Sequence, residues 1–322
     1  MMSELDLNKV PEAKKNDISV KSDDMVPCNG TCGNDVAKGQ MHVISGLVSY
    51  VINDKNPPEV CTAIGNAEVE YVESEDLKDV EDVDCTMKKL THGLNSSDWY
   101  VVCESLNNVR RLSIFHMEAM RAILYDVLPL IVKSLKNPRS GVCKTAIMAS
   151  ADLFRTYNDS IIDSLDPLLM QLLLKASQDK KFVCEAAERS LILLTHSVSP
   201  MLLLPKLQPY LQNKNPRIRA RASLCYSRSV PRLGVEGVQS YGIDKLIQVA
   251  ASQLSDQLPE SREAARALLQ DLQTMYEKSN ALAADANLKS WEQFCHLNLS
   301  PLNAQAVLRV TNIAREPLIL GS

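Results

Sequence analysis

Several residue types and motifs are scarce or missing in this chain of 322 residues, and each absence narrows the range of functions. Aromatic residues make up only 5% of the chain, and glycine contributes 11 residues. The sequence has no G-x-G-x-x-G or G-x4-G-K-[ST] phosphate loop and no H-E-x-x-H metal motif. The histidines are scattered, without a paired acid or cysteine at motif spacing. We therefore expect neither an enzyme nor a bound cofactor.

Long apolar runs are also missing. None approaches the ~20 residues of a membrane span, and the first residues contain no apolar segment of the kind that signal peptides have. Most of the nine cysteines lie in apolar stretches, as reduced thiols in cytosolic proteins do. Cys28 and Cys32 form a C-x3-C pair without a second pair, which favours free thiols over a zinc site. These features predict a soluble, intracellular protein without a membrane anchor.

Positive charge is unevenly distributed. Residues 1–90 contain 18 acidic residues, 9 lysines and no arginine, whereas residues 91–322 carry a net charge of +5. The first arginine is Arg110. Residues 1–83 lack sustained apolar periodicity and contain the acidic block EVEYVESEDLKDVEDVD, so we expect a largely disordered acidic leader. The sequence pI of about 5.8 and the lack of aromatics among the basic turns disfavour nucleic acid as a partner.

From about residue 84 the chain is built from repeats. Pro129, Pro167 and Pro205 are each 38 residues apart, and each lies in a leucine-rich stretch that ends in a polar turn. A second apolar stretch follows each turn, with a stripe at helical spacing such as Val142, Ala146, Ala149 and Leu153. A small residue recurs at one place in these second stretches, namely Ala146, Ala187, Ala222 and Ala265. Repeated helix–turn–helix units must stack to bury their apolar faces.

This pattern predicts an all-α fold: an α-solenoid of about five to six HEAT-like, armadillo-type helical hairpins. We assign residues 84–279 to the solenoid. Residues 280–322 are expected to form a C-terminal cap helix and tail, with Trp291 packed at the end of the stack.

The turns within the hairpins should lie along one edge of the stack. Residues 213–221 read NKNPRIRAR, and Asn-Pro-Arg also occurs at residues 137–139. The predicted partner-binding residues on this edge are Trp99, Arg139, Ser140, Val142, Lys180, Lys181, Lys214, Arg217, Arg219, Arg262 and Arg266. A line of cations would attract and orient an acidic partner. Solvated turn residues are the alternative for each cation alone, and Trp99 could instead fold back onto the hairpin. Because alternate helical residues diverge, Arg219 should point away from Arg217, toward the neighbouring repeat.

Several short motifs occur in one order: SSDW, NPRSGVCKTA, QDKKFVCEAAERSL, NKNPRIRARA and PESREAARALL. In this order and spacing they resemble the TOG domain, a paddle of six HEAT repeats that binds tubulin, and most closely its CLASP branch. The likeness covers about residues 84–279. It implies that Trp99 and Val142 contact tubulin and that Lys181, Lys214, Arg217 and Arg262 face its acidic surface. The bulky Phe182 in the third turn and the Leu258-Pro259 pair in the fifth depart from the family pattern.

The resemblance implies a cytoplasmic, cytoskeleton-associated protein that binds tubulin or microtubules through the turn edge of one TOG-like domain. The alternative is a HEAT-repeat scaffold that binds a different acidic protein. Family members usually carry several TOG units or a long basic linker, whereas this chain has one unit. We also expect the acidic leader to compete for the basic turns as an autoinhibitory segment.

Overall fold

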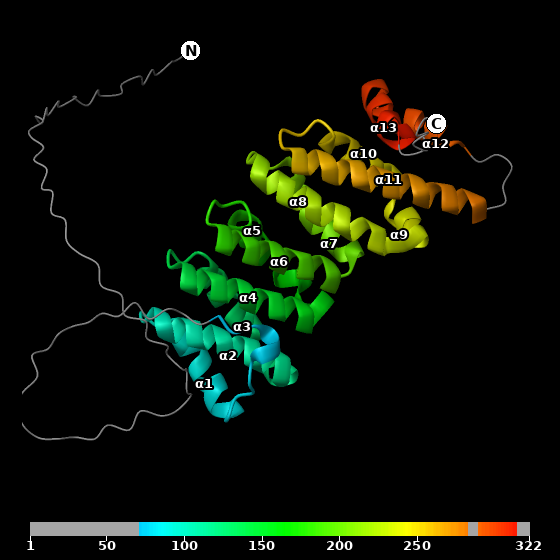
Figure 1. Ribbon diagram of the computed structural model, residues 1–322. Coiled ribbons are helices and arrows are strands. Elements are labelled where there is room, and N and C mark those ends of the chain that lie inside the picture. Colours follow the sequence, from blue (N-terminus) through cyan, green and yellow to red (C-terminus); the bar gives the residue numbers. More distant parts are fainter. Residues whose placement is uncertain (1–70, 283–288, 314–322) are drawn as a thin grey trace, which may run out of the picture. The chain divides into compact units, whose positions relative to one another are not determined.

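The structure, a computed structural model, describes residues 71–282 and 289–313, which belong to one compact unit of the chain (Figure 1). Regular structure in these ranges is entirely helical. The first helices of the hairpins are α1 (Val83–Leu94), α3 (Met117–Leu135), α5 (Leu165–Lys175), α7 (Pro200–Leu207), α10 (Ile243–Gln253) and α12 (Trp291–Asn298). The second helices are α2 (Trp99–Phe115), α4 (Ser140–Tyr157), α6 (Lys181–Ser197), α8 (Pro216–Ser229), α11 (Pro259–Leu282) and α13 (Pro301–Ile313). Between them lie α9 (Gly234–Tyr241) and the 3-10 turns η1 (Ser74–Asp76), η2 (Asn158–Ser164), η3 (Gln208–Gln212) and η4 (Val230–Leu233).

Short polar residues begin several of these helices. The Asp98 carboxylate accepts a hydrogen bond from the Tyr100 N–H at 2.9 Å, and Asn215 caps α8 in the same way through the Arg217 N–H. Such caps satisfy backbone donors that have no partner inside the helix. Pro216 occupies the first position of α8, where its missing N–H costs no hydrogen bond.

The second helices α2, α4, α6, α8 and α11 lie side by side in chain order (Figure 1). We call the surface that they form the second-helix face. The alanines predicted at the helix crossings, Ala146, Ala187, Ala222 and Ala265, are all buried. The apolar stripe of α4 is fully buried as well. The solenoid prediction is therefore confirmed, because the second helices pack through the positions that the periodicity selected.

The last hairpin continues the stack beyond the predicted boundary. Both α12 and α13 pack against α11, so residues 289–313 form a sixth hairpin rather than a single cap helix. Trp291 is buried against Tyr276 and Phe294, and its indole N–H donates to the Thr311 hydroxyl at 3.2 Å. Its packing role at the end of the stack is confirmed.

Residues 71–82, which we call the strap, differ from the expected disordered leader. Leu77 is buried, and the Tyr71 ring lies 3.7 Å from the Lys144 ammonium group on α4. Farther along, Glu75 forms an ion pair with Arg155, and Asp79 contacts the His116 ring at 2.7 Å. The strap is therefore an ordered segment on the second-helix face. Residues 1–70 of the leader, including Cys28 and Cys32, lie outside the described residues.

Arg110 explains why the strap holds its place. Its guanidinium Nε donates to the Asp152 carboxylate at 2.7 Å, and the two side chains are only 1% and 2% exposed. The strap supplies further hydrogen bonds to both members of this pair. The Val72 carbonyl accepts a hydrogen bond from Arg110 at 2.7 Å, and the Ser74 hydroxyl donates one to the Asp152 carboxylate at 2.6 Å. A buried ion pair is tolerated only when its remaining donors and acceptors are satisfied. The strap supplies two of those partners.

Candidate functional site

Contacts link the turns of the first five hairpins: turns one and two, three and four, and four and five meet directly, and Lys144 near the start of α4 approaches the ring of Phe182 in turn three. We call the surface that these turns form the turn edge; it comprises residues 95–100, 136–140, 176–182, 213–219 and 254–266. The Arg139 guanidinium lies 5.3 Å from the centre of the Trp99 ring, which joins turns one and two. Arg217 pairs with Asp179 of turn three, and Arg219 pairs with Asp256 of turn five. Residues about 40 positions apart in sequence therefore share one surface.

Turns one and two carry an aromatic and cationic group. Trp99 is half-buried and packs partly on the core, while its ring also stacks with Arg139 and meets the Tyr100 ring edge-on at 6.2 Å. Tyr100 is 59% exposed. Within the described residues, Arg139 has no ion pair. An exposed cation on one aromatic ring, with a second ring beside the first, is a composition typical of binding surfaces.

Turn three combines lysines with a large apolar side chain. Phe182 is partly exposed, and the Lys180 and Lys144 ammonium groups lie 5.5 and 5.9 Å from its ring. Lys181 pairs loosely with Glu185 at 3.8 Å, on the next turn of α6. Burial is the main cause that lowers the pKa of Lys144, and the nearby Arg189 lowers that pKa further.

Turns four and five are joined by the ion pair between Arg219 and Asp256. Arg219 is pinned by the Asp256 carboxylate at 2.6 Å and by the Asn213 carbonyl at 2.8 Å. Burial by itself would raise the pKa of Asp256, but hydrogen bonds from Arg219 and the Leu258 N–H lower it below its ordinary value. Arg262 donates to the carbonyl groups of Asp256 and Gln257. These cations stabilise the turns themselves.

The structure sorts the remaining predicted residues into surface and core. Lys214 and Arg266 are exposed and, among the described residues, take part in no ion pair, whereas Ser140 is half-buried at the start of α4. Val142 is fully buried in the α4 stripe. The surface contact implied for Val142 is therefore corrected: Val142 lies two residues beyond Ser140, and its buried side chain packs within the hairpin.

Sequence reasoning missed the anions of the turn edge. Asp179 and Asp256 neutralise Arg217 and Arg219, so the strip is less positive than the list of cations suggests. Each carboxylate lies in a turn adjacent to its arginine's own turn, and the repeat pattern could have located both. Exposed Tyr100 was also missed, although it directly follows Trp99.

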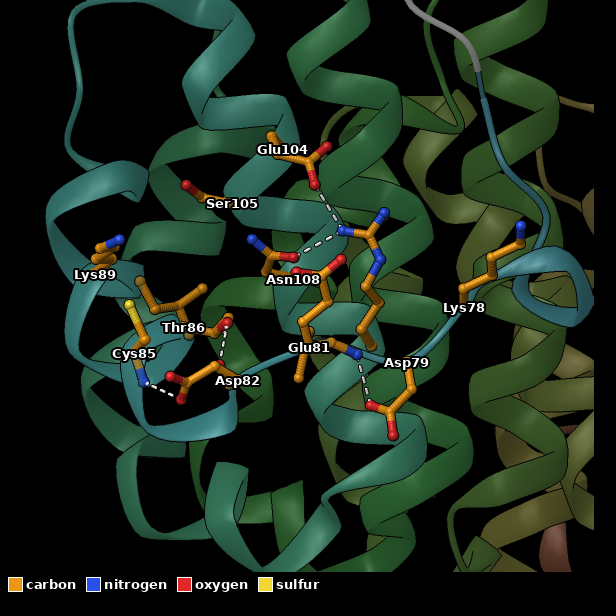
Figure 2. Close-up of a pocket in the computed structure, with 13 residues that line it drawn as sticks. Lys78, Asp79, Glu81, Asp82, Cys85, Thr86, Lys89, Glu104, Ser105 and Asn108 are labelled. Carbon is orange, nitrogen blue, oxygen red and sulfur yellow. Dashed lines mark hydrogen bonds and ion pairs between the residues drawn. The ribbon is translucent and has the colours of Figure 1, made fainter. Parts of the chain in front are cut away.

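A separate depression of about 450 Å³ lies between the strap, α1 and α2 (Figure 2). Charged groups of both signs line it. Arg111 is engaged by Glu104 at 2.6 Å and Asn108 at 2.7 Å, and Asp82 accepts the Cys85 N–H that caps α1. Because Arg111 and Asp82 are already engaged by neighbouring groups, and charges of both signs line the rest, we assign no chemistry to this depression.

The described ranges give no sign of a metal centre or a membrane span. No three His, Cys, Asp or Glu side chains within residues 71–282 and 289–313 are grouped to hold a metal ion. No helix in the same ranges combines the length and apolar character that crossing a bilayer requires.

Comparison with known proteins places these observations in a family. Residues 113–290, more than half of the chain, match the family model "CLASP N terminal". The mouse (Mus musculus) protein "TOG array regulator of axonemal microtubules protein 1" is 30% identical over 131 residues. That segment is 41% of this chain and 7% of the mouse protein. The chain thus corresponds to a small part of this relative's length.

Solved structures agree on the fold. A chain from "Structural Basis of Microtubule Plus End Tracking by XMAP215, CLIP-170 and EB1" matches with a TM-score of 0.53 and 18% identity, covering 74% of this chain and 95% of that chain. The "TOG domain structure from C.elegans Zyg9" matches with a TM-score of 0.51 and 16% identity, covering 70% and 81%. At this level of identity the likeness shows a shared fold, that of TOG domains.

Proposed function

This chain belongs to the CLASP N-terminal family, and on that basis we propose that it is a microtubule-associated protein that binds tubulin through its turn edge. The mouse relative is named as a regulator of axonemal microtubules, which supports the general role. We place the protein with the cytoskeleton in the cytoplasm. The proposed activity is binding rather than catalysis.

One observation carries the choice of surface. Trp99, Tyr100 and Arg139 form a partly exposed aromatic and cationic group where turns one and two meet. Tryptophan, tyrosine and arginine are the residues most enriched where interface energy concentrates. Helix stability does not account for Arg139, because a cation at a helix N-terminus opposes the helix dipole. An acidic partner does account for it.

The remaining cations extend this surface in a weaker way. Lys180, Lys214 and Arg266 are exposed, and Arg217 holds Asp179 in an ion pair that is largely in solvent. Exposed ion pairs contribute little and exchange partners easily. A carboxylate of an acidic protein surface could thus replace Asp179 as the partner of Arg217 with little loss of free energy. We therefore assign turns three to five the role of orienting the bound partner.

Binding of purified tubulin to the full-length protein, followed by size-exclusion chromatography and titration, tests the proposal. We expect Trp99→Glu to weaken binding at least ~30-fold, the loss typical of an interface anchor. Because Trp99 also packs on the core, Arg139→Glu serves as a second variant; it removes an exposed cation and should weaken binding ~10-fold with an unchanged melting temperature.

Arg228→Glu is the matched control. Arg228 is exposed near the end of α8, away from the turn edge, and its reversal changes the net charge by the same amount. Tubulin binding that is absent in the wild type, or equal in Arg139→Glu and wild type, would contradict the proposal. Absent tubulin binding would favour the alternative of a scaffold for a different acidic protein.

A further inference from the structure

A groove on the second-helix face is independent of the turn edge. It lies between α4 and α6 with the strap along one side, and its volume is about 190 Å³. Ile147, Met148 and Ala151 of α4 and Leu193 of α6 make it partly apolar. Lys144, Arg155 and Arg189 add positive charge. We call this depression the α4–α6 groove.

The charges around the groove do not cancel. Glu75 of the strap pairs with Arg155 at 3.5 Å, and the negative charge of Glu73 acts on Lys144. Arg189 is exposed, and no ion pair within the described residues involves it. One cation of the groove is thus left over after the strap carboxylates are matched.

Ser190 supplies a second, independent observation. It lines the groove next to Arg189, is 1% exposed, and its hydroxyl oxygen has no hydrogen-bond partner among the described residues. A buried hydroxyl without a partner is costly and uncommon in folded proteins. An acceptor brought into the groove would satisfy the Ser190 hydroxyl while its negative charge meets Arg189.

The strap shows what kind of molecule this face binds. Residues 71–76, Tyr-Val-Glu-Ser-Glu-Asp, lie on the same face and join two apolar side chains to a run of acidic ones. Their contacts are a ring on the Lys144 ammonium, a carbonyl on Arg110 and a carboxylate on Arg155. The α4–α6 groove likewise offers a cation, Arg189, and adds the Ser190 hydroxyl donor and an apolar floor.

We propose that the α4–α6 groove binds an extended acidic peptide segment of a partner protein, lying beside the strap. A carboxylate of the peptide bonds Arg189 and Ser190, and a neighbouring aliphatic side chain covers Met148 and Leu193. The occupant is a peptide rather than a small anion, because the groove joins its cation to an apolar floor. This site does not depend on tubulin binding by the turn edge.

The experiment uses the full-length protein and a fluorescent synthetic peptide, EVEYVESEDL, which copies residues 68–77. We expect anisotropy to show saturable binding that Arg189→Glu weakens at least ~10-fold and that Ser190→Ala weakens less. A probe with lysine at each glutamate position should not bind. The control Arg228→Glu, a reversal on the next second helix, should bind the probe like the wild type.

Two outcomes would overturn the proposal. The first is equal affinity of the probe for Arg189→Glu and for the wild type. The probe would then be binding in place of the strap and not in the α4–α6 groove. The second is a probe that does not bind the wild-type protein. If proteolysis of the leader is in that case also faster in Arg189→Glu than in the wild type, the groove binds the chain's own upstream segment instead of a partner. Tubulin titrations of the same variants separate the two sites: Arg189→Glu should keep tubulin binding, and Trp99→Glu should keep peptide binding.

Discussion

Both the turn edge and the second-helix face contain ion pairs between neighbouring repeats, but these pairs differ in how far they are exposed to solvent. On the second-helix face, Arg110 and Asp152 are 1% and 2% exposed. On the turn edge, Arg219 and Asp256 are 19% and 6% exposed, whereas Arg217 and Asp179 are 55% and 89% exposed. The three pairs join neighbouring repeats about 40 residues apart. Burial, rather than residue type, therefore decides which arginines hold the fold and which stay in contact with solvent.

The buried pair should give the largest effect. Arg110→Ala would leave the Asp152 charge in the core without its partner, and such losses cost about 3–5 kcal/mol of unfolding free energy. Urea denaturation followed by circular dichroism measures the change. The neighbouring variant Arg111→Ala removes a partly exposed pair with Glu104 and should cost at most ~1 kcal/mol. Equal losses of unfolding free energy in Arg110→Ala and Arg111→Ala would show that burial does not set the contribution of an ion pair to stability.

The intermediate pair should follow. Arg219→Ala leaves the Asp256 carboxylate and the Asn213 carbonyl without their donor, so we expect a loss of about 1–3 kcal/mol in the same measurement. Because the pKa of Asp256 is lowered in the folded protein, the stabilisation is fully present above the ordinary carboxylate pKa of about 4 and disappears as the pH falls through the lowered value. The difference between wild type and Arg219→Ala should therefore shrink in acid, and a constant difference would show that the Asp256 charge is not its source.

The exposed pair should give the smallest effect on stability. Arg217→Ala is expected to change the unfolding free energy by less than ~0.5 kcal/mol, while tubulin affinity falls roughly threefold, more at low salt than at high salt. Titrations at two ionic strengths check the second point. A stability loss as large as that of Arg219→Ala would mean that solvent exposure does not separate the two pairs.

Much of this molecule follows from local sequence pattern. The stripes of α4 and α6 and the alanines at the crossings follow from helical periodicity, and the cap at Asp98 follows from the preference of short polar side chains for that position. The alignment of the turns follows from the 38-residue repeat. These features depend on residues close in sequence or on exact repetition, so one chain is enough to predict them.

Other features depend on contacts that periodicity does not encode. Whether Arg217 stays free or pairs with Asp179 depends on the offset between neighbouring hairpins. Whether Val142, two residues after Ser140, faces solvent or the core depends on the rotation of α4 about its axis relative to its neighbours. Strap residues have the low apolar content of a disordered segment, and their order follows from the buried Arg110–Asp152 pair, whose members are 42 residues apart.

The contacts of the strap also determine where N-terminal deletions should be made. A truncated protein that starts at Val83 would lack the Val72 carbonyl and the Ser74 hydroxyl, so Arg110 and Asp152 would open to water and Leu77 would no longer cover its neighbours. Any gain or loss of binding in that truncation would mix removal of acidic sequence with damage to the solenoid. Deletions that ask what the first seventy residues do should therefore begin the remaining chain at Tyr71.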